Sequence, residues 1–165
     1  MATSVNDQTE YGLREQNRTR LLEMLTLMGK FDHEKVSAEA GGYADGRYPD
    51  LYDERGRLDI PFMPKDMKNF REGPVEHRAD AELRFWIFRD FQWVGEFEIH
   101  DCLDPSRFIV FATGRGRTRR GVPYENSYVF FATLRDGKIL NMREYADTSR
   151  MMVLADDLAD AGTFA

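Results

Sequence analysis

The second half of the chain is divided by turn signals into four segments of β-strand character. These segments run from Trp93 to Cys102, Phe108 to Thr118, Pro123 to Leu134 and Lys138 to Asp147. Asp104-Pro105-Ser106, Arg120-Gly121 and Asp136-Gly137 separate them, and Asp-Gly between two apolar segments is a strong hairpin signal. Because strands joined by such short turns pair antiparallel, this half is predicted to form a four-strand meander.

The first half is predicted to be mainly helical. A helix from Leu13 to Gly29 is indicated by leucines and a methionine at helical spacing, and a second, short helix is expected from Asp32 to Ala40. The segment from Lys65 to about Phe91 is predicted to be helical in two pieces, broken near Gly73-Pro74. A terminal helix is expected from Thr148 to about Asp160.

The segment from Tyr43 to Pro64 contains too many glycines and prolines for long regular elements. It is expected to form a short irregular hairpin or a loop over the mouth of a pocket. Two interpretations of Tyr43, Tyr48 and Tyr52 stay open: they contact a ligand, or they close the core.

Helices followed by a consecutive antiparallel sheet predict an α+β fold, in which the helices cover one face of the sheet. Residues 13–158 are expected to form one domain, with flexible ends at 1–12 and 159–165. Apolar residues also alternate onto the second face, at Val129, Phe131, Ile139 and Tyr145. This pattern predicts a homodimer that pairs through the sheet face.

Charge and composition argue against several classes of protein. The formal net charge of −6 disfavours nonspecific nucleic-acid binding, which depends on neutralising phosphates with Lys and Arg. The polar segment from Met1 to Glu10 has no apolar signal region, and no long apolar run indicates a membrane span. Cys102 is the only cysteine, which fits a reducing compartment, so a cytoplasmic location is expected.

The last strand contains the residue that most clearly suggests chemistry. By strand alternation, Leu140, Met142 and Glu144 share one face, so Glu144 continues an apolar row. A carboxylate in such surroundings is partly desolvated, and its pKa is expected to rise toward the range of a general acid or base. The alternative is that Glu144 pairs with Arg84 or Arg89 and only stabilises the sheet.

Other residues are candidates for supporting roles. Asn126 and Tyr128 alternate on the neighbouring strand and could hydrogen-bond to an oxyanion or hold the carboxylate, and Arg84 is a candidate substrate-binding residue. His77 and His100 are the other titratable candidates, although His100 falls on a polar row that more often faces water.

Several chemistries lack their motifs. Gly114-Arg115-Gly116 does not continue as a dinucleotide fingerprint, and it is interpreted as a place where strand backbones crowd. No GxxxxGK[ST] phosphate loop, GxSxG elbow, HxH pair or HExxH motif occurs. No metal or cofactor is therefore expected.

The sequence resembles the SnoaL-like group of the nuclear transport factor 2-like superfamily, and within it the phenazine-biosynthesis PhzA/PhzB proteins. The resemblance is carried by Leu13-Arg14-Glu15-Gln16-Asn17-Arg18, Gly114-x-Gly116, Tyr124-x-Asn126, Asp136-Gly137-Lys138-Ile139 and Arg143-Glu144-Tyr145. It implies a cone of N-terminal helices packed on a curved, mainly antiparallel sheet that encloses a pocket. It also implies that Glu144 is the pocket acid, and it approximately matches His77 to a family histidine in the third helix.

The superfamily contains both enzymes and binding proteins, so the fold alone does not name a reaction. The resemblance implies a cofactor-free acid/base enzyme of isomerase, dehydratase, cyclase or carbon–carbon lyase type. Its substrate is expected to be a hydrophobic, oxygenated, aromatic small molecule. The rival hypothesis is a noncatalytic ligand-binding or association module that uses the same pocket or the open sheet face.

Overall fold

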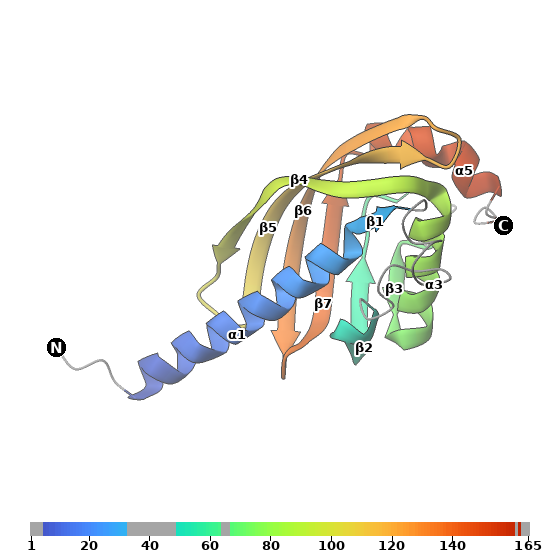
Figure 1. Ribbon diagram of the computed structural model, residues 1–165. Helices are drawn as coiled ribbons and strands as arrows, with labels where there is room; N and C mark the ends of the chain where they lie inside the picture. Colours follow the sequence, from blue (N-terminus) through green and yellow to red (C-terminus); the bar gives the residue numbers. More distant parts are fainter. Residues whose placement is uncertain (1–4, 33–48, 64–66, 161, 163–165) are drawn as a thin grey trace.

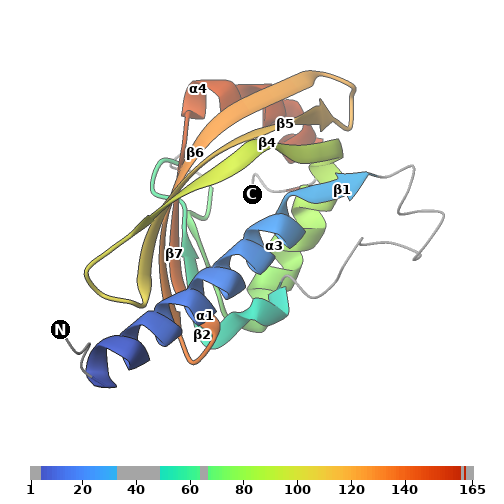
Figure 2. The ribbon, with the colours of Figure 1, turned by 60° about the vertical axis from the view of Figure 1, so that its left-hand side comes forward.

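The computed structural model describes residues 5–32, 49–63, 67–160 and 162. One mixed sheet of seven strands, in the order β1-β4-β5-β6-β7-β2-β3, dominates these residues (Figure 1). Helices α1 and α3 lie on the same side of the curved sheet (Figure 2). The predicted α+β fold, with helices packed on a mainly antiparallel sheet, is therefore confirmed. The short helix predicted from Asp32 to Ala40 lies outside the described residues, except for Asp32. Tyr43 and Tyr48 also lie outside them.

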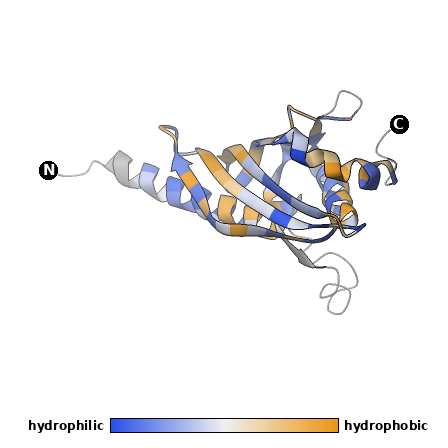
Figure 3. Cartoon of the chain, turned by 90° about the horizontal axis from the view of Figure 1, so that it is seen from above, coloured by the Kyte–Doolittle hydropathy of each residue, from blue (hydrophilic) through white to orange (hydrophobic). Residues whose placement is uncertain are grey.

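The four-strand meander is present as predicted. It consists of β4 (Phe88–Asp101), β5 (Arg107–Thr118), β6 (Pro123–Arg135) and β7 (Lys138–Ala146), each antiparallel to the next. Asp136 and Gly137 form the β6–β7 turn, with φ of 51° and 72°. Both lie in the left-handed region that a tight hairpin turn needs, which is why the Asp-Gly pair is a reliable signal. Hydrophobic positions recur along these strands (Figure 3).

The prediction for residues 65–91 was wrong in three respects. Phe70–Glu72 is a strand, β3, which pairs antiparallel with β2 (Tyr52–Asp59). Gly73-Pro74 begins helix α3 (Gly73–Ile87) instead of breaking a helix. Proline is tolerated in the first turn because its missing N–H would have no partner there. The helix ends at Ile87, and strand β4 starts at Phe88 instead of Trp93.

Strand β2 reaches the meander by a pairing that the sequence did not indicate. It lies parallel to β7, with Leu58 opposite Met142 and Asp59 opposite Arg143. A short 3-10 helix, η1 (Pro49–Leu51), precedes it. The β2–β3 hairpin therefore extends the meander beyond β7 and leads directly into α3, whose Arg84, near the end of the helix, reaches Glu144.

Helix α1 (Val5–Met28) covers the other half of the same sheet face. It begins before the predicted Leu13, because the preceding polar residues, Glu10 among them, include good helix formers although they carry no apolar stripe. Leu21, Met24 and Leu25 are fully buried against the sheet. Trp93 on β4 donates a hydrogen bond from Nε1 to the backbone oxygen of Leu25 at 2.6 Å, which fixes the helix to the sheet. A short edge strand, β1 (Lys30–Asp32), follows α1 and pairs with β4.

The segment that follows β7, residues 148–160, packs over the part of the sheet nearest α3. It contains α4 (Thr148–Met151), a 3-10 turn η2 (Met152–Leu154) and α5 (Ala155–Asp160). Leu154 and Leu158 are buried. The predicted terminal helix is thus present as three short pieces.

Strand alternation failed at one position of β7. Ile139 was expected on the outer face, but it is fully buried on the helix side. Leu134 pairs with Ile139 and Thr133 pairs with Asn141, so Leu140 is an extra residue in β7. A bulge of this kind reverses the parity of the residues on one side of it. Met142 and Glu144 keep the predicted inward direction, and Ile139 joins them.

Candidate active site

Glu144 lies on the helix-covered face of β7, opposite Phe130 of β6. Only 4% of its surface is exposed. Its carboxylate Oε2 accepts a hydrogen bond from Nη2 of Arg84, a residue of α3, at 3.0 Å. Arg84 is therefore the ion-pair partner of Glu144, one of the two arginines considered from the sequence.

This ion pair continues into a chain of alternating charges. Asp80, one turn before Arg84 on α3, accepts a hydrogen bond from Arg84 Nε at 2.8 Å and another from Arg71 Nε at 3.1 Å. Burial alone would raise the pKa of Asp80, but the positive charges of Arg84 and Arg71 outweigh it and hold that pKa below its usual range. Two arginines and two carboxylates thus balance one another between α3, β3 and β7.

Two tyrosine hydroxyls lie on β6 near this chain. The hydroxyl oxygens of Tyr124 and Tyr128 are 2.6 Å apart, and Asn126 Nδ2 donates to the Tyr124 hydroxyl at 3.1 Å. Burial raises the pKa of both phenols, and that of Tyr128 lies well above the ordinary value. Both hydroxyls therefore stay protonated near neutral pH and act as hydrogen-bond donors or acceptors, not as bases.

These groups surround a small cavity of about 70 Å³. Arg84, Glu144, Tyr124 and Tyr128 form its polar wall, together with Asp80 and Arg71. Its apolar wall comes from the segment after β2, the inner side of α3, and the chain end, where Met151, Leu154 and Leu158 contribute. A carboxylate, a guanidinium and two phenols thus converge on one space, which allows proton transfer next to an oxygen held by hydrogen bonds.

Asn126 lies near the site, but its side chain bonds the backbone that follows β7 instead of facing the cavity. Its Oδ1 accepts from the Asp147 backbone N–H at 3.1 Å, and its Nδ2 donates to the Asp147 oxygen at 3.0 Å as well as to Tyr124. Asn126 does not line the cavity. It fixes the chain after β7 and orients Tyr124, so its contact with the site is indirect.

His77 and Tyr52 lie together, outside the cavity wall. Their rings stack with centroids 3.7 Å apart, and His77 Nε2 is 2.8 Å from the Gly56 carbonyl oxygen, to which it donates. Burial lowers the pKa of His77. The Tyr52 hydroxyl is 3.9 Å from Met142 Sδ, and burial raises its pKa. A neutral, stacked histidine of this kind fastens α3 to β2.

The structure therefore brings together three of the predicted site residues, Glu144, Arg84 and Tyr128. Sequence reasoning missed Tyr124, Asp80 and Arg71. Tyr124 could have been found, because it has the same strand parity as Tyr128. Asp80 and Arg71 gave no such signal, because charged residues are frequent throughout this part of the sequence.

Two structural features are absent from the part of the chain that the structure describes. These residues contain no group of three or more His, Cys, Asp or Glu side chains placed to hold a metal ion. No helix among them is long and apolar enough to span a membrane.

No protein-family model and no curated protein sequence matches the chain. Solved structures do match. A phenazine biosynthesis-related protein, PhzB2, from Pseudomonas aeruginosa is 21% identical and superimposes with a TM-score of 0.72 over 89% of each chain. The BvnE pinacolase from Penicillium brevicompactum is 15% identical, with a TM-score of 0.66 over 91% of this chain and 99% of its own.

A nuclear transport factor 2-like protein from Burkholderia xenovorans LB400 is 17% identical, with a TM-score of 0.63 over 85% of this chain and 95% of its own. The chain has the nuclear transport factor 2-like fold. A SnoaL-like protein from Jannaschia sp. CCS1 is also among the matching structures, so the resemblance inferred from sequence motifs is confirmed for the fold. Of these matching proteins, BvnE is named as an enzyme, a pinacolase.

Proposed function

We propose that this protein is a cofactor-free acid/base enzyme that acts on a hydrophobic, oxygenated, aromatic small molecule. The observation that carries the proposal is the convergence of Glu144, Arg84, Tyr124 and Tyr128 on one small cavity. The ion pair with Arg84 offsets the cost of burying the Glu144 carboxylate, and both groups line the cavity, where a ligand can contact them. Structural neighbours that are named as enzymes support the same conclusion.

In the proposed reaction Glu144 moves the proton. Its carboxylate accepts a proton from a carbon next to a carbonyl group, and returns it to another atom of the substrate. The electron pair released from the carbon–hydrogen bond shifts to the carbonyl oxygen, which becomes an enolate oxygen. Isomerisation, dehydration, cyclisation and carbon–carbon cleavage can all pass through such an intermediate. The geometry therefore supports this class of acid/base reactions without selecting one of them.

The tyrosine pair stabilises the oxygen. A hydroxyl of Tyr124 or Tyr128 donates a hydrogen bond to the carbonyl oxygen, and that bond strengthens as negative charge develops. Because burial raises the pKa of both phenols, neither competes with Glu144 as a base near neutral pH. Arg84 bonds the carboxylate and also Asp80, which keeps Glu144 in one position.

The substitution Glu144→Gln tests the proposal. The measurement is deuterium incorporation from heavy water into hydrophobic ketones, beginning with 2-tetralone, followed by NMR. We expect the variant to lose at least about 100-fold in exchange rate relative to the wild-type protein. Glu125→Gln is the matched control, because Glu125 is exposed and pairs with Arg115 on the outer face of the sheet.

Two outcomes would contradict acid/base catalysis by Glu144. One is a Glu144→Gln variant that exchanges as fast as the wild-type protein. The other is a wild-type protein that gives no exchange above buffer while it still binds the ketones, as the rival binding module would.

A further inference from the structure

The cavity beside Glu144 is too small to enclose a substrate of the proposed class. Its volume is about 70 Å³. Ligand pockets usually measure about 300–1,000 Å³, and a dry cavity that accepts benzene measures about 150 Å³. Only the reacting end of an aromatic ligand fits inside, so the rest of the molecule needs another place to bind.

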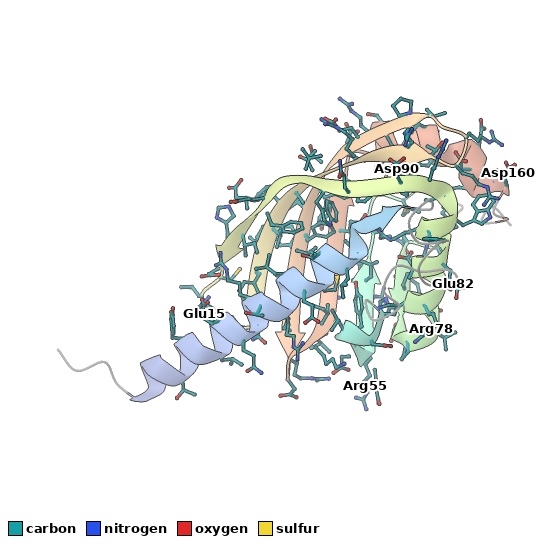
Figure 4. All side chains as sticks on the ribbon, in the orientation of Figure 1. Glu15, Arg55, Arg78, Glu82, Asp90 and Asp160 are labelled. Atoms are coloured by element: carbon teal, nitrogen blue, oxygen red, sulfur yellow. The ribbon has the colours of Figure 1, made fainter. Side chains whose placement is uncertain are left out.

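A larger groove lies on the other side of the same wall. It measures about 630 Å³ and is bordered by α3, by Arg71 of β3 and by Asp160 at the end of α5. Glu82 and Asp160, which border the groove, are labelled on the same side of the molecule in Figure 4. The volume of the groove falls within the range of ordinary ligand sites.

Three side chains line both spaces. Arg71, Asp80 and Leu83 each border the groove and also the cavity, so the two are separated by one layer of side chains. Leu83 is half-buried. Leu83 can therefore form the movable part of a passage between the two spaces, because it lines both of them. The Arg71–Asp80 ion pair forms the part of the passage that stays in place.

The groove offers an aromatic wall. Trp86 borders it, and the Arg119 guanidinium carbon lies 4.7 Å from the centroid of its ring. Arg119 occupies one face of the indole and limits its movement. Ala79 and Leu83 extend the apolar surface along α3. A flat apolar ligand can pack on this strip.

The charges at the rim of the groove are unequal. Lys68 pairs with Glu76 at 2.5 Å, and Asp160 pairs with Arg120, also at 2.5 Å. Glu82 is exposed, and it forms no ion pair with any other residue that the structure describes. The rim therefore favours a neutral or basic group and disfavours an acidic one.

We propose that this groove is an outer substrate site, which binds a flat apolar body with a neutral or basic far end. The oxygen end of the same molecule passes Leu83 and reaches Tyr128 and Glu144. This inference rests on the proposed function and adds the class of substrate: an extended aromatic molecule with an oxygen at one end and no anionic group at the other.

Three probes of one shape test the outer site by calorimetry at low salt. They are 2-naphthol, 6-(aminomethyl)-2-naphthol and 6-hydroxy-2-naphthoate, which are neutral, cationic and anionic at their far ends. We expect the cationic probe to bind at least about threefold more tightly than the anionic one. Glu82→Gln removes that preference, and Trp86→Ala weakens all three about fivefold.

Control variants distinguish the contribution of the groove to probe affinity from general effects of a substitution on the protein. Glu96→Gln removes an exposed charge on β4 and should leave all three affinities unchanged. Trp86→Phe keeps a smaller apolar wall and should give intermediate affinities, which guards against misfolding of Trp86→Ala.

The proposed outer site would be contradicted if none of the three probes binds, or if the Trp86 and Glu82 variants bind all three probes as the wild-type protein does. Such a result would not contradict catalysis by Glu144 if Glu144→Gln still abolished deuterium exchange. Conversely, groove-dependent binding without any exchange would contradict the enzyme and retain the ligand site.

Discussion

Asp80 is the residue on which the charge balance of the site depends. It bonds Arg71 and Arg84 at once, and only 4% of its surface is exposed. Without it, two partly buried guanidinium groups would face one remaining carboxylate, Glu144. The sequence did not indicate Asp80, because its role in the charge balance depends on arginines of α3 and β3 that come together only in the folded chain.

Asp80→Asn is expected to lower the free energy of unfolding by about 3 kcal/mol, because breaking a buried ion pair leaves an uncompensated charge. Urea denaturation measures this change. Asp50→Asn is the matched control: Asp50 pairs with Arg78, but both side chains are more than half exposed, so its effect should stay within about 0.5 kcal/mol. Equal effects of the two substitutions would contradict the importance of the buried network.

His77 makes stability depend on pH. Burial lowers its pKa, while the Gly56 carbonyl, Asp80 and Glu76 act in the opposite direction and Arg71 acts with burial. Below about pH 6.5 the unfolded chain takes up a proton at this histidine more readily than the folded chain. The stability that the neutral histidine contributes is therefore full above that pH, and is lost as the pH falls below it.

We expect the free energy of unfolding to decrease between about pH 7.5 and about pH 5, and to decrease less in a His77→Gln variant. Urea denaturation at several pH values measures both slopes. The lowered pKa of Asp80 has a similar effect only at more acidic pH, below about 4. Parallel slopes for the two proteins would show that His77 does not titrate as inferred.

At the scale of elements, close contact between β4 and β5 explains the two glycines of Gly114-Arg115-Gly116. A Cβ on Gly116 would lie 2.1 Å from the backbone oxygen of Asp90, and one on Gly114 would lie 2.3 Å from the Phe91 ring. The interpretation of this segment as a place of backbone crowding is therefore confirmed for Gly116, whereas Gly114 is crowded by the side chain of Phe91. Crowding of this kind lets β5 pack tightly beneath the start of β4.

Gly116→Ala is expected to destabilise the protein by about 2 kcal/mol, because the contact involves backbone that cannot move aside. Thermal unfolding measures the loss. Gly12→Ala in α1 is the control: apart from the neighbouring residues and the backbone of the helix itself, no atom lies within 4 Å of the position that the added methyl group would take. Alanine also favours helix by up to about 1 kcal/mol. If Gly116→Ala were as stable as Gly12→Ala, the close approach of the strands would be wrong.

At the scale of the whole molecule, the outer face of the sheet carries an aromatic patch. Phe111 and Phe131 are 42% and 45% exposed, and Tyr145 contacts both Phe131 and Phe62 edge-on. Val129 lies on the same face, as predicted, whereas Ile139 does not. Exposed aromatic residues that lie together on one surface favour association. We propose that two copies pair through this face.

We expect the wild-type protein to be a dimer in light scattering at micromolar concentration, and Phe131→Arg to be a monomer, because a charge in the centre of an apolar interface is costly. Leu103→Arg is the control, since Leu103 is fully exposed at the β4–β5 turn, away from the patch. A wild-type protein that is monomeric under these conditions would contradict the dimer.

The sequence by itself determined the meander, its Asp136-Gly137 turn and the inward direction of Tyr128 and Glu144. These follow from local rules, because side chains alternate along a strand and a tight turn needs residues that accept positive φ. Only the tertiary structure decided which residues accompany Glu144. Arg84 is 60 residues away in sequence, and β2 joins β7 through a pairing that no local pattern encodes. Contacts over such separations depend on how helices and strands pack together, and neither alternation nor propensity describes that packing.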